Sequence, residues 1–270
     1  MAVAVIAFGL WPNKVVAGTI SISVESQYQP GLSNLVVQVQ NKGDEAAQNV
    51  SVSVEFMERS AKAPVIPTLE PNLPHMANFP IDITSIVGTY PIIITVEFED
   101  LNGYPFTSIA LNQLRAPNSP MSPLRVSMAS TKIRGSGFVK AKIYNSADRP
   151  IVVSYRFLIP RELLSNDAKG SFELAPKSRE TFKLHLENFS AIPGATYPVH
   201  LLLEHDEGNI HYLSPGVAIT TIYGKSLIRS RLFWIALAIV FVAIGGSLVW
   251  RRKVTSPDAD TGEAPYKDQS

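Results

Sequence analysis

The residues best suited to carry chemistry are histidines and carboxylates grouped in the second half of the chain: His200, His205, Asp206, Glu207 and His211. On an extended strand, His200 and His205 point to opposite faces because they are five residues apart. His205 and His211 could face each other across a turn at Gly208. A zinc site needs three or four converging ligands, and this spacing supplies two. We therefore expect polar residues that flank a hairpin, with no bound metal.

The other candidate sites are weaker. Glu97, Glu99 and Asp100, with Asn102 nearby, offer oxygen atoms at a turn, but they lack the regular spacing of a calcium loop. The chain has no cysteine, which excludes thiolate ligands and cysteine nucleophiles. No Gly-x-Ser-x-Gly motif occurs, and Gly135-Ser136-Gly137 lacks the lysine of a phosphate-binding loop. The sequence thus predicts a protein that is not an enzyme and that needs no cofactor.

A long apolar stretch near the C-terminus organises the rest of the chain. Leu232 to Trp250 holds nineteen residues without a charge, and a helix of that length spans roughly 28 Å, close to the hydrocarbon core of a bilayer. We expect a transmembrane helix over residues 230–250, with anchor residues Leu232, Phe233, Trp234, Gly245, Gly246 and Trp250. The basic residues expected to flank the membrane are Arg229, Arg231, Arg251, Arg252 and Lys253.

The N-terminus resembles a secretory signal. Residues 1–17 combine an apolar run with small residues at Val15-Val16-Ala17, where a signal peptidase would cleave, although no Lys or Arg precedes the run. A first strand or a short uncleaved anchor would also fit. With a signal peptide, residues 18 to about 230 lie outside the cytoplasm, and the polar tail 251–270 is cytoplasmic and disordered.

Residues 19–222 have the period-two alternation of β-strands throughout. Ile92, Ile94, Val96 and Phe98 alternate with Ile93, Thr95, Glu97 and Glu99, so we expect the first set in a core and the second set towards solvent. The balance of 24 basic and 23 acidic residues gives no reason to expect nucleic-acid binding.

The two halves of this region repeat each other. VQVQNKGDEAAQNVSVSVEF, which ends at Phe56, parallels VKAKIYNSADRPIVVSYRF, which ends at Phe157. In both, one strand ends at an asparagine, Asn41 or Asn145, and the offset stays between 101 and 107 residues. This pattern predicts a tandem duplication, with sandwiches over residues 18–116 and 125–224. The linker 117–124 is rich in proline, so we expect it to space the modules along a line.

The order NKGDEAAQNVSVSVEF, then LEP, then GTYPIIITVEFEDLNG resembles the immunoglobulin-like modules of NEW3, CARDB and archaeal S-layer-domain-like surface proteins. The resemblance covers residues 20 to 222, more loosely in the second copy. It implies exposure outside the cytoplasm and a role in binding or spacing. We expect an all-β fold of two tandem immunoglobulin-like β-sandwiches plus one C-terminal transmembrane α-helix.

The expected function is that of a single-pass cell-membrane protein. Besides the lipid bilayer, its expected partner is a protein or a component of the cell envelope, and it could serve as a subunit of a membrane complex. The alternative is an accessory carbohydrate-binding component of a hydrolase or transport system. All three tryptophans, Trp11, Trp234 and Trp250, lie outside the two modules, so sugar stacking would fall to tyrosines such as Tyr104, Tyr155 and Tyr212.

Overall fold

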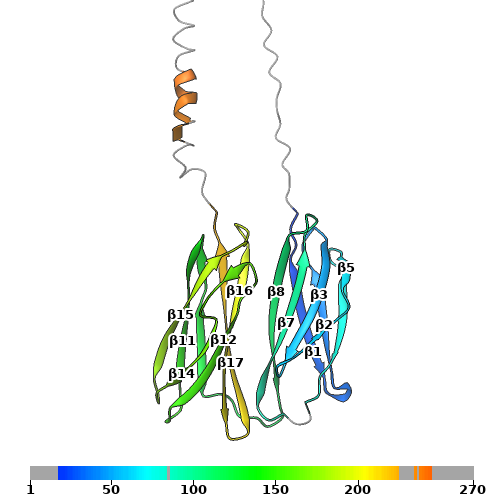
Figure 1. Ribbon diagram of the computed structural model, residues 1–270, viewed down its shortest axis with the longest axis vertical. Coiled ribbons are helices and arrows are strands. Elements are labelled where there is room, and N and C mark those ends of the chain that lie inside the picture. Colours follow the sequence, from blue (N-terminus) through cyan, green and yellow to red (C-terminus); the bar gives the residue numbers. More distant parts are fainter. Residues whose placement is uncertain (1–17, 84–85, 225–233, 236, 245–270) are drawn as a thin grey trace, which may run out of the picture. The chain divides into compact units, whose positions relative to one another are not determined.

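The computed structural model describes residues 18–83, 86–224, 234–235 and 237–244. The chain divides into two compact units, Met1–Tyr223 and Gly224–Ser270. The described part of the first unit is almost wholly β-structure and forms two sandwiches (Figure 1). The predicted all-β class is therefore confirmed for the region before residue 224.

The first sandwich contains strands β1 to β8. One sheet has the order β1 (Ile22–Gln29), β2 (Asn34–Asn41), β6 (Pro74–Pro80). The facing sheet has the order β4 (Arg59–Lys62), β3 (Ala47–Phe56), β7 (Thr89–Glu99), β8 (Pro105–Arg115), and β5 (Ile66–Leu69) also pairs with β3. A short 3-10 helix, η1 (Pro30–Leu32), connects β1 to β2. β5 contains Pro67 and β6 contains Pro74 and Pro80, and both strands lie at sheet edges, where proline is tolerated.

The second sandwich contains strands β9 to β17. One sheet has the order β13 (Leu163–Leu164), β15 (Arg179–Asn188), β11 (Ser136–Asn145), β9 (Leu124–Ala129). The other has the order β10 (Thr131–Ile133), β17 (Ile210–Ile222), β16 (Thr196–Glu207), β12 (Ile151–Leu158), β14 (Lys169–Leu174). β10 runs parallel to β17, and the other strand pairs are antiparallel. This is the strand order of an immunoglobulin-like sandwich.

The two sandwiches repeat one another strand by strand, as the duplicated sequence predicts. β1, β2, β3, β6, β7 and β8 correspond to β9, β11, β12, β15, β16 and β17 in order and pairing. The turns expected near Asn102 and at Gly208 are confirmed, and both are hairpins: β7 turns into β8 at Asn102-Gly103, and β16 turns into β17 at Gly208-Asn209. Each sandwich has a separate core of aliphatic and aromatic side chains between its sheets.

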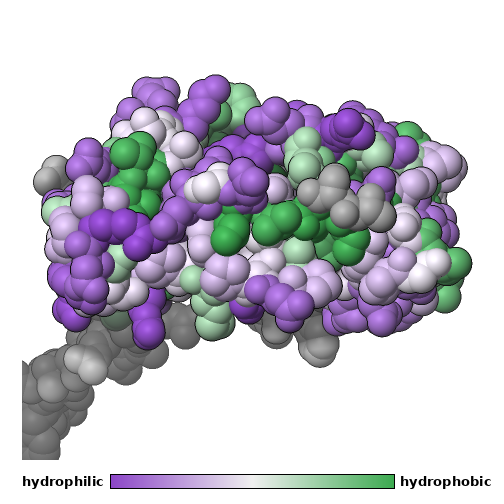
Figure 2. Space-filling view, turned by 90° about the horizontal axis from the view of Figure 1, so that it is seen from below, coloured by the Kyte–Doolittle hydropathy of each residue, from purple (hydrophilic) through white to green (hydrophobic). Residues whose placement is uncertain are grey.

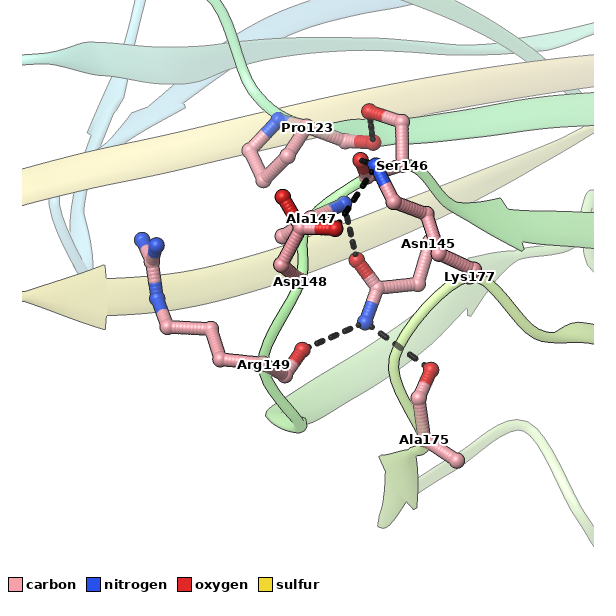
Figure 3. Close-up of polar contacts among 8 residues, drawn as sticks. All are labelled: Pro123, Asn145, Ser146, Ala147, Asp148, Arg149, Ala175 and Lys177. Atoms are coloured by element: carbon pink, nitrogen blue, oxygen red, sulfur yellow. Dashed lines mark hydrogen bonds and ion pairs between the residues drawn. The ribbon is translucent and has the colours of Figure 1, made fainter.

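The repeated asparagines perform the same task in both copies. Asn145 is fully buried, and its Nδ2 donates to the carbonyl oxygens of Arg149 (2.9 Å), Leu174 (3.3 Å) and Ala175 (3.0 Å), two of which appear in Figure 3. Its Oδ1 accepts from the N–H of Ala147 (2.9 Å). One side chain thus satisfies backbone groups on two loops that would otherwise lack partners.

Asn41 occupies the equivalent position in the first sandwich and is also fully buried. Its Oδ1 accepts from the N–H groups of Gly43 (2.9 Å) and Ser21 (3.2 Å), and its Nδ2 donates to the carbonyl oxygens of Glu45 (2.6 Å) and Leu69 (3.4 Å). The asparagine that ends each of the two strands is therefore a structural element of the repeat.

Described residues of the second unit are helical at 234–235 and 237–244. Within the described part of the chain, no helix is long and apolar enough to cross a membrane. Trp234 lies in this helical segment. The other predicted anchor and flanking residues lie outside the described residues, and they are Leu232, Phe233, Gly245, Gly246, Trp250, Arg229, Arg231, Arg251, Arg252 and Lys253. The predicted signal peptide and the cytoplasmic tail lie outside them too.

Candidate functional site between the two sandwiches

The two sandwiches pack against each other through the outer faces of the sheets that contain β7 and β16. Ile93 of β7, Leu202 of β16 and Leu213 of β17 form a third buried cluster, with Ile109, Leu111 and Leu158 packed around it. Ile93 is only 5% exposed, so the prediction that it faces solvent is wrong. Because the modules contact each other in this way, the expectation that the linker spaces them along a line is also wrong.

Polar contacts flank this apolar cluster. The guanidinium of Arg156 pairs with Glu55 (Nη1–Oε1, 2.7 Å), and His200 donates from Nε2 to the carbonyl oxygen of Ile109 (3.2 Å). The Thr107 N–H donates to Oε1 of the buried Glu162 (2.8 Å), and burial raises the pKa of that carboxyl. Each contact joins one sandwich to the other, so the interface combines an apolar centre with polar groups at its margin.

Gly88 allows the backbones of the two sandwiches to approach each other closely. The His211 N–H donates to the Val87 carbonyl (3.0 Å), and Gly88 and His211 form an isolated parallel bridge. Gly88 has φ +116°, and a Cβ atom there would overlap the His211 carbonyl. The imidazole of His211 stacks on the Tyr90 ring at a centroid distance of 4.4 Å. The equivalent residue of the second copy is Ala195.

The linker is held by both sandwiches. Ser119 accepts at Oγ from the Gly88 N–H (3.0 Å), and its carbonyl accepts from Nε of Arg115 (3.0 Å). On the other side, Ser214 donates to Ser122 Oγ (2.7 Å) and contacts the Leu124 carbonyl (3.1 Å). The linker is therefore fixed by hydrogen bonds on each side of the interface.

The predicted histidine group is divided between two environments. His205 pairs with Tyr212 in the β16–β17 register and Asp206 pairs with His211, so the two histidines occupy opposite faces. His211 faces the interface, where its Nδ1 bonds Asp206 (2.7 Å) and its Nε2 bonds Glu204 (3.3 Å). Hydrogen bonds to these two carboxylates raise the pKa of His211. His205 and His211 therefore do not face each other. Among the described residues, no group of side chains is suited to hold a metal.

His205 takes the place of a core aromatic residue. It is 7% exposed, its ring lies parallel to that of Tyr212 at 4.8 Å, and neither ring nitrogen has a hydrogen-bond partner among the described residues. In the first sandwich the equivalent pair is Phe98 and Phe106, stacked at 5.6 Å. Burial lowers the pKa of His205 because the charged imidazolium is poorly solvated there.

We predict that His205→Phe stabilises the protein by about 1 kcal/mol or more, because it removes two unpartnered buried nitrogens. The pKa of His205 is lower in the folded protein than in the unfolded chain. As pH falls below the ordinary histidine pKa, the unfolded chain takes up a proton that the folded protein does not, so the wild type loses stability. The gain should therefore grow from pH 7.5 to pH 5. Urea unfolding of both proteins across this range measures it. The partly exposed His185→Phe is the control, and equal gains at both pH values would contradict the prediction.

A cavity of about 600 Å³ opens beside the interface. Its lining includes Glu55, Arg156, Glu204, Asp206 and His211, whose charges are already paired as described above. Of these pairs, Arg156–Glu55 joins the two sandwiches, whereas His211, Glu204 and Asp206 pair with one another within the second sandwich. The cleft is thus a consequence of the docking geometry.

The remaining candidate residues have structural roles. Asp100 accepts at Oδ1 from the N–H groups of Asn102 (2.8 Å) and Tyr104 (2.9 Å), so it closes the β7–β8 turn. The rings of Tyr155 and Tyr212 pack inside the second sandwich, whereas Tyr104 is exposed. Of the three tyrosines considered as sugar platforms, Tyr104 is exposed, Tyr155 is partly exposed and lines the cavity beside the interface, and Tyr212 is buried.

Sequence reasoning missed the interface, although two signals for it were present. Residues 92–94 and 201–203 are continuous apolar runs, Ile-Ile-Ile and Leu-Leu-Leu. A strand buried on both faces has such a run, whereas a half-exposed strand alternates. The second signal was Gly88 in place of Ala195, directly before the Thr-Tyr-Pro sequence that the two copies share.

Exposed hydrophobic side chains also occur away from the interface, among them Leu32, Met121 and Phe189. On the face drawn in Figure 2, hydrophobic residues lie in groups among hydrophilic ones. Small separate groups of this kind are ordinary on soluble domains.

No protein family matches the chain, and no curated protein matches it. Among solved structures, trypsin-activated alpha-2-macroglobulin from Escherichia coli is 11% identical with a TM-score of 0.30, over 75% of this chain and 18% of that one. Red sea bream transglutaminase is 14% identical with a TM-score of 0.25, over 78% and 32%. A protein of unknown function from Porphyromonas gingivalis W83 is 9% identical with a TM-score of 0.31, over 75% and 99%. The chain thus spans less than a fifth of the alpha-2-macroglobulin. Likenesses this distant carry no argument, and the fold assignment rests on the strand order.

Proposed function

We propose that this chain is a non-enzymatic membrane-tethered protein whose two immunoglobulin-like sandwiches act outside the cytoplasm as one binding unit. The observation that carries the proposal is the docking of the sandwiches through Ile93, Leu202 and Leu213. Docking holds the loops and edges of both sandwiches in fixed relative positions. A surface organised before binding loses less conformational entropy when a partner binds. A protein or envelope partner, or a membrane complex of which this chain is a subunit, suits such a surface.

Support for the membrane tether comes from the second unit considered by itself. Its described helical residues expose apolar side chains, including Ile239, Phe241 and Val242. A helix that is apolar all round is unstable in water and needs a covering of protein or lipid. The uncharged stretch Leu232–Trp250 and the basic residues that follow it favour lipid.

The carbohydrate-binding alternative has less support. Residues 18–223 contain no tryptophan, and the rings of Tyr155 and Tyr212 are packed against other aromatic side chains. We therefore propose a polypeptide or envelope component, rather than a sugar, as the partner.

The tether and its orientation can be tested because the chain has no cysteine of its own. We expect the full chain to stay in the membrane pellet after carbonate extraction. Asp148→Cys, at a side chain that is 91% exposed, should react with a membrane-impermeant maleimide on intact cells. Ser270→Cys should react only after the cells have been lysed. Recovery of the full chain in the soluble fraction, or labelling of Ser270→Cys on intact cells, would refute the proposal.

A further inference from the structure

We propose that the free edge of β6 binds an extended, uncharged segment of a partner polypeptide, which joins the first sandwich as an additional strand. This deepens the proposed binding role by naming the surface. The starting observation is a difference between the two copies. In the second sandwich, β15 pairs with β11 on one side and with β13 on the other. Its counterpart β6 pairs with β2, and no described strand lies on its other side.

The backbone of β6 is oriented to accept such a strand. Pro74, Met76, Asn78 and Pro80 share one parity in the β2–β6 register. Proline has no N–H and cannot donate to a neighbouring strand. The four residues of this parity are therefore the ones that exchange no hydrogen bonds with their partners in β2. The N–H groups of Met76 and Asn78 therefore point to the open edge. An incoming strand would find backbone donors and acceptors already in line, as in β-strand addition.

The charge pattern separates β6 from the other long edges. Native sheets commonly protect an edge strand with charged side chains, which oppose pairing with another chain. Of the outermost strands longer than four residues, β1, β8, β9 and β14 carry Glu25, Arg115, Arg125 and Lys169 respectively. β6, with the sequence PHMANFP, has no Asp, Glu, Lys or Arg. Proline also opposes pairing at an edge, but Pro74 and Pro80 lie at the two ends of β6, so the edge between them lacks protection.

A groove beside β6 indicates the chemistry of the partner. It has a volume of about 350 Å³, runs between β5 and β6, and is lined mainly by apolar residues that include Val65, Ile66 and Met76. Val65 and Met76 are 57% and 52% exposed. Because the lining contains no Asp, Glu, Lys or Arg, a buried charge would be costly there and an aliphatic side chain would be favoured. In the second sandwich, the covering strand buries Leu163 to 3% exposure.

The test uses the full chain in detergent micelles and, as the probe, a phage-displayed library of random decapeptides. We expect enriched peptides with aliphatic residues at alternate positions and no charge at their centre. Asn78→Pro removes an outward N–H and should weaken binding of a synthesised peptide about tenfold, the equivalent of one lost hydrogen bond. Asn78→Thr is the matched control. It also loses the Asn34 contact (Nδ2–Oδ1, 3.0 Å) but keeps the N–H, so its affinity should stay close to that of the wild type.

A second pair of variants keeps the proposal testable if Asn78→Pro unfolds the first sandwich. Met76→Glu places a charge beside the groove without touching the backbone and should abolish peptide binding, whereas Met76→Leu should preserve it. Three results would overturn the proposal. The library could yield no enriched sequence pattern, or each variant and its control could change peptide affinity equally. The full chain could also form a dimer that the β6 variants dissociate. Membrane extraction should be unaffected by these variants, so failure here is distinct from failure of the tether.

Discussion

Asn145→Ala should lower the free energy of unfolding of the second sandwich by about 3 kcal/mol, because it leaves several buried backbone groups without partners. The lost bonds join Asn145 to Ala147, Arg149, Leu174 and Ala175. Urea unfolding followed by tyrosine fluorescence measures the change. Asn41→Ala should act similarly in the first sandwich, since Asn41 occupies the same position there.

Two controls separate the hydrogen bonds from the loss of volume. Asn145→Asp keeps the size and the acceptor but brings a carboxylate towards three carbonyl oxygens, so it should destabilise at least as much as alanine. Asn112 is exposed and contacts Ser26, and its replacement by alanine should cost less than about 0.5 kcal/mol. A change of less than about 1 kcal/mol for Asn145→Ala would show that water replaces the lost contacts.

Gly88→Ala should separate the two sandwiches while leaving each of them folded. An alanine at φ +116° is strained, and its Cβ would overlap the His211 carbonyl. Relief requires β17 to move away, which breaks the bond from the His211 N–H to Val87 and the stacking on Tyr90. We expect a single unfolding transition in the wild type to become two transitions in calorimetry, and small-angle scattering to report a larger radius of gyration.

Gly103→Ala is the matched control for this variant. Gly103 also has positive φ, +77°, but nothing lies within 4 Å of the position of its Cβ. It should pay the backbone cost of roughly 1 kcal/mol and keep the sandwiches docked. If Gly88→Ala and Gly103→Ala behave alike, the contact at His211 does not hold the sandwiches together.

The sequence predicted those features that are determined by neighbouring residues. Alternation identified the core residues Ile92, Ile94 and Val96, and turn chemistry identified both hairpins. The repeat placed Asn41 and Asn145 at equivalent strand ends. These features depend on the local period of apolar residues and on conformational preferences at turns, both of which a single sequence contains.

The interface was missed for a physical reason. Alternation divides a strand into two faces, but it does not say what covers the second face. Ile93 was expected to face solvent because Thr95, Glu97 and Glu99 share its parity, and these polar residues lie farther along the same strand. His205 was interpreted as a surface residue because its type is polar, whereas its alignment with Phe98 identifies a core position.

The pairing of β10 with the end of β17 has a mechanical consequence. Thr131–Ile133 run parallel to Thr220–Ile222, the last strand residues of the first unit. A pull on the chain beyond Tyr223 therefore loads these bonds side by side in shear, together with those that join β17 to β16. Bonds loaded in this way must break together, whereas bonds at a peeled edge break one after another. The second sandwich should consequently resist tension applied at its C-terminal end.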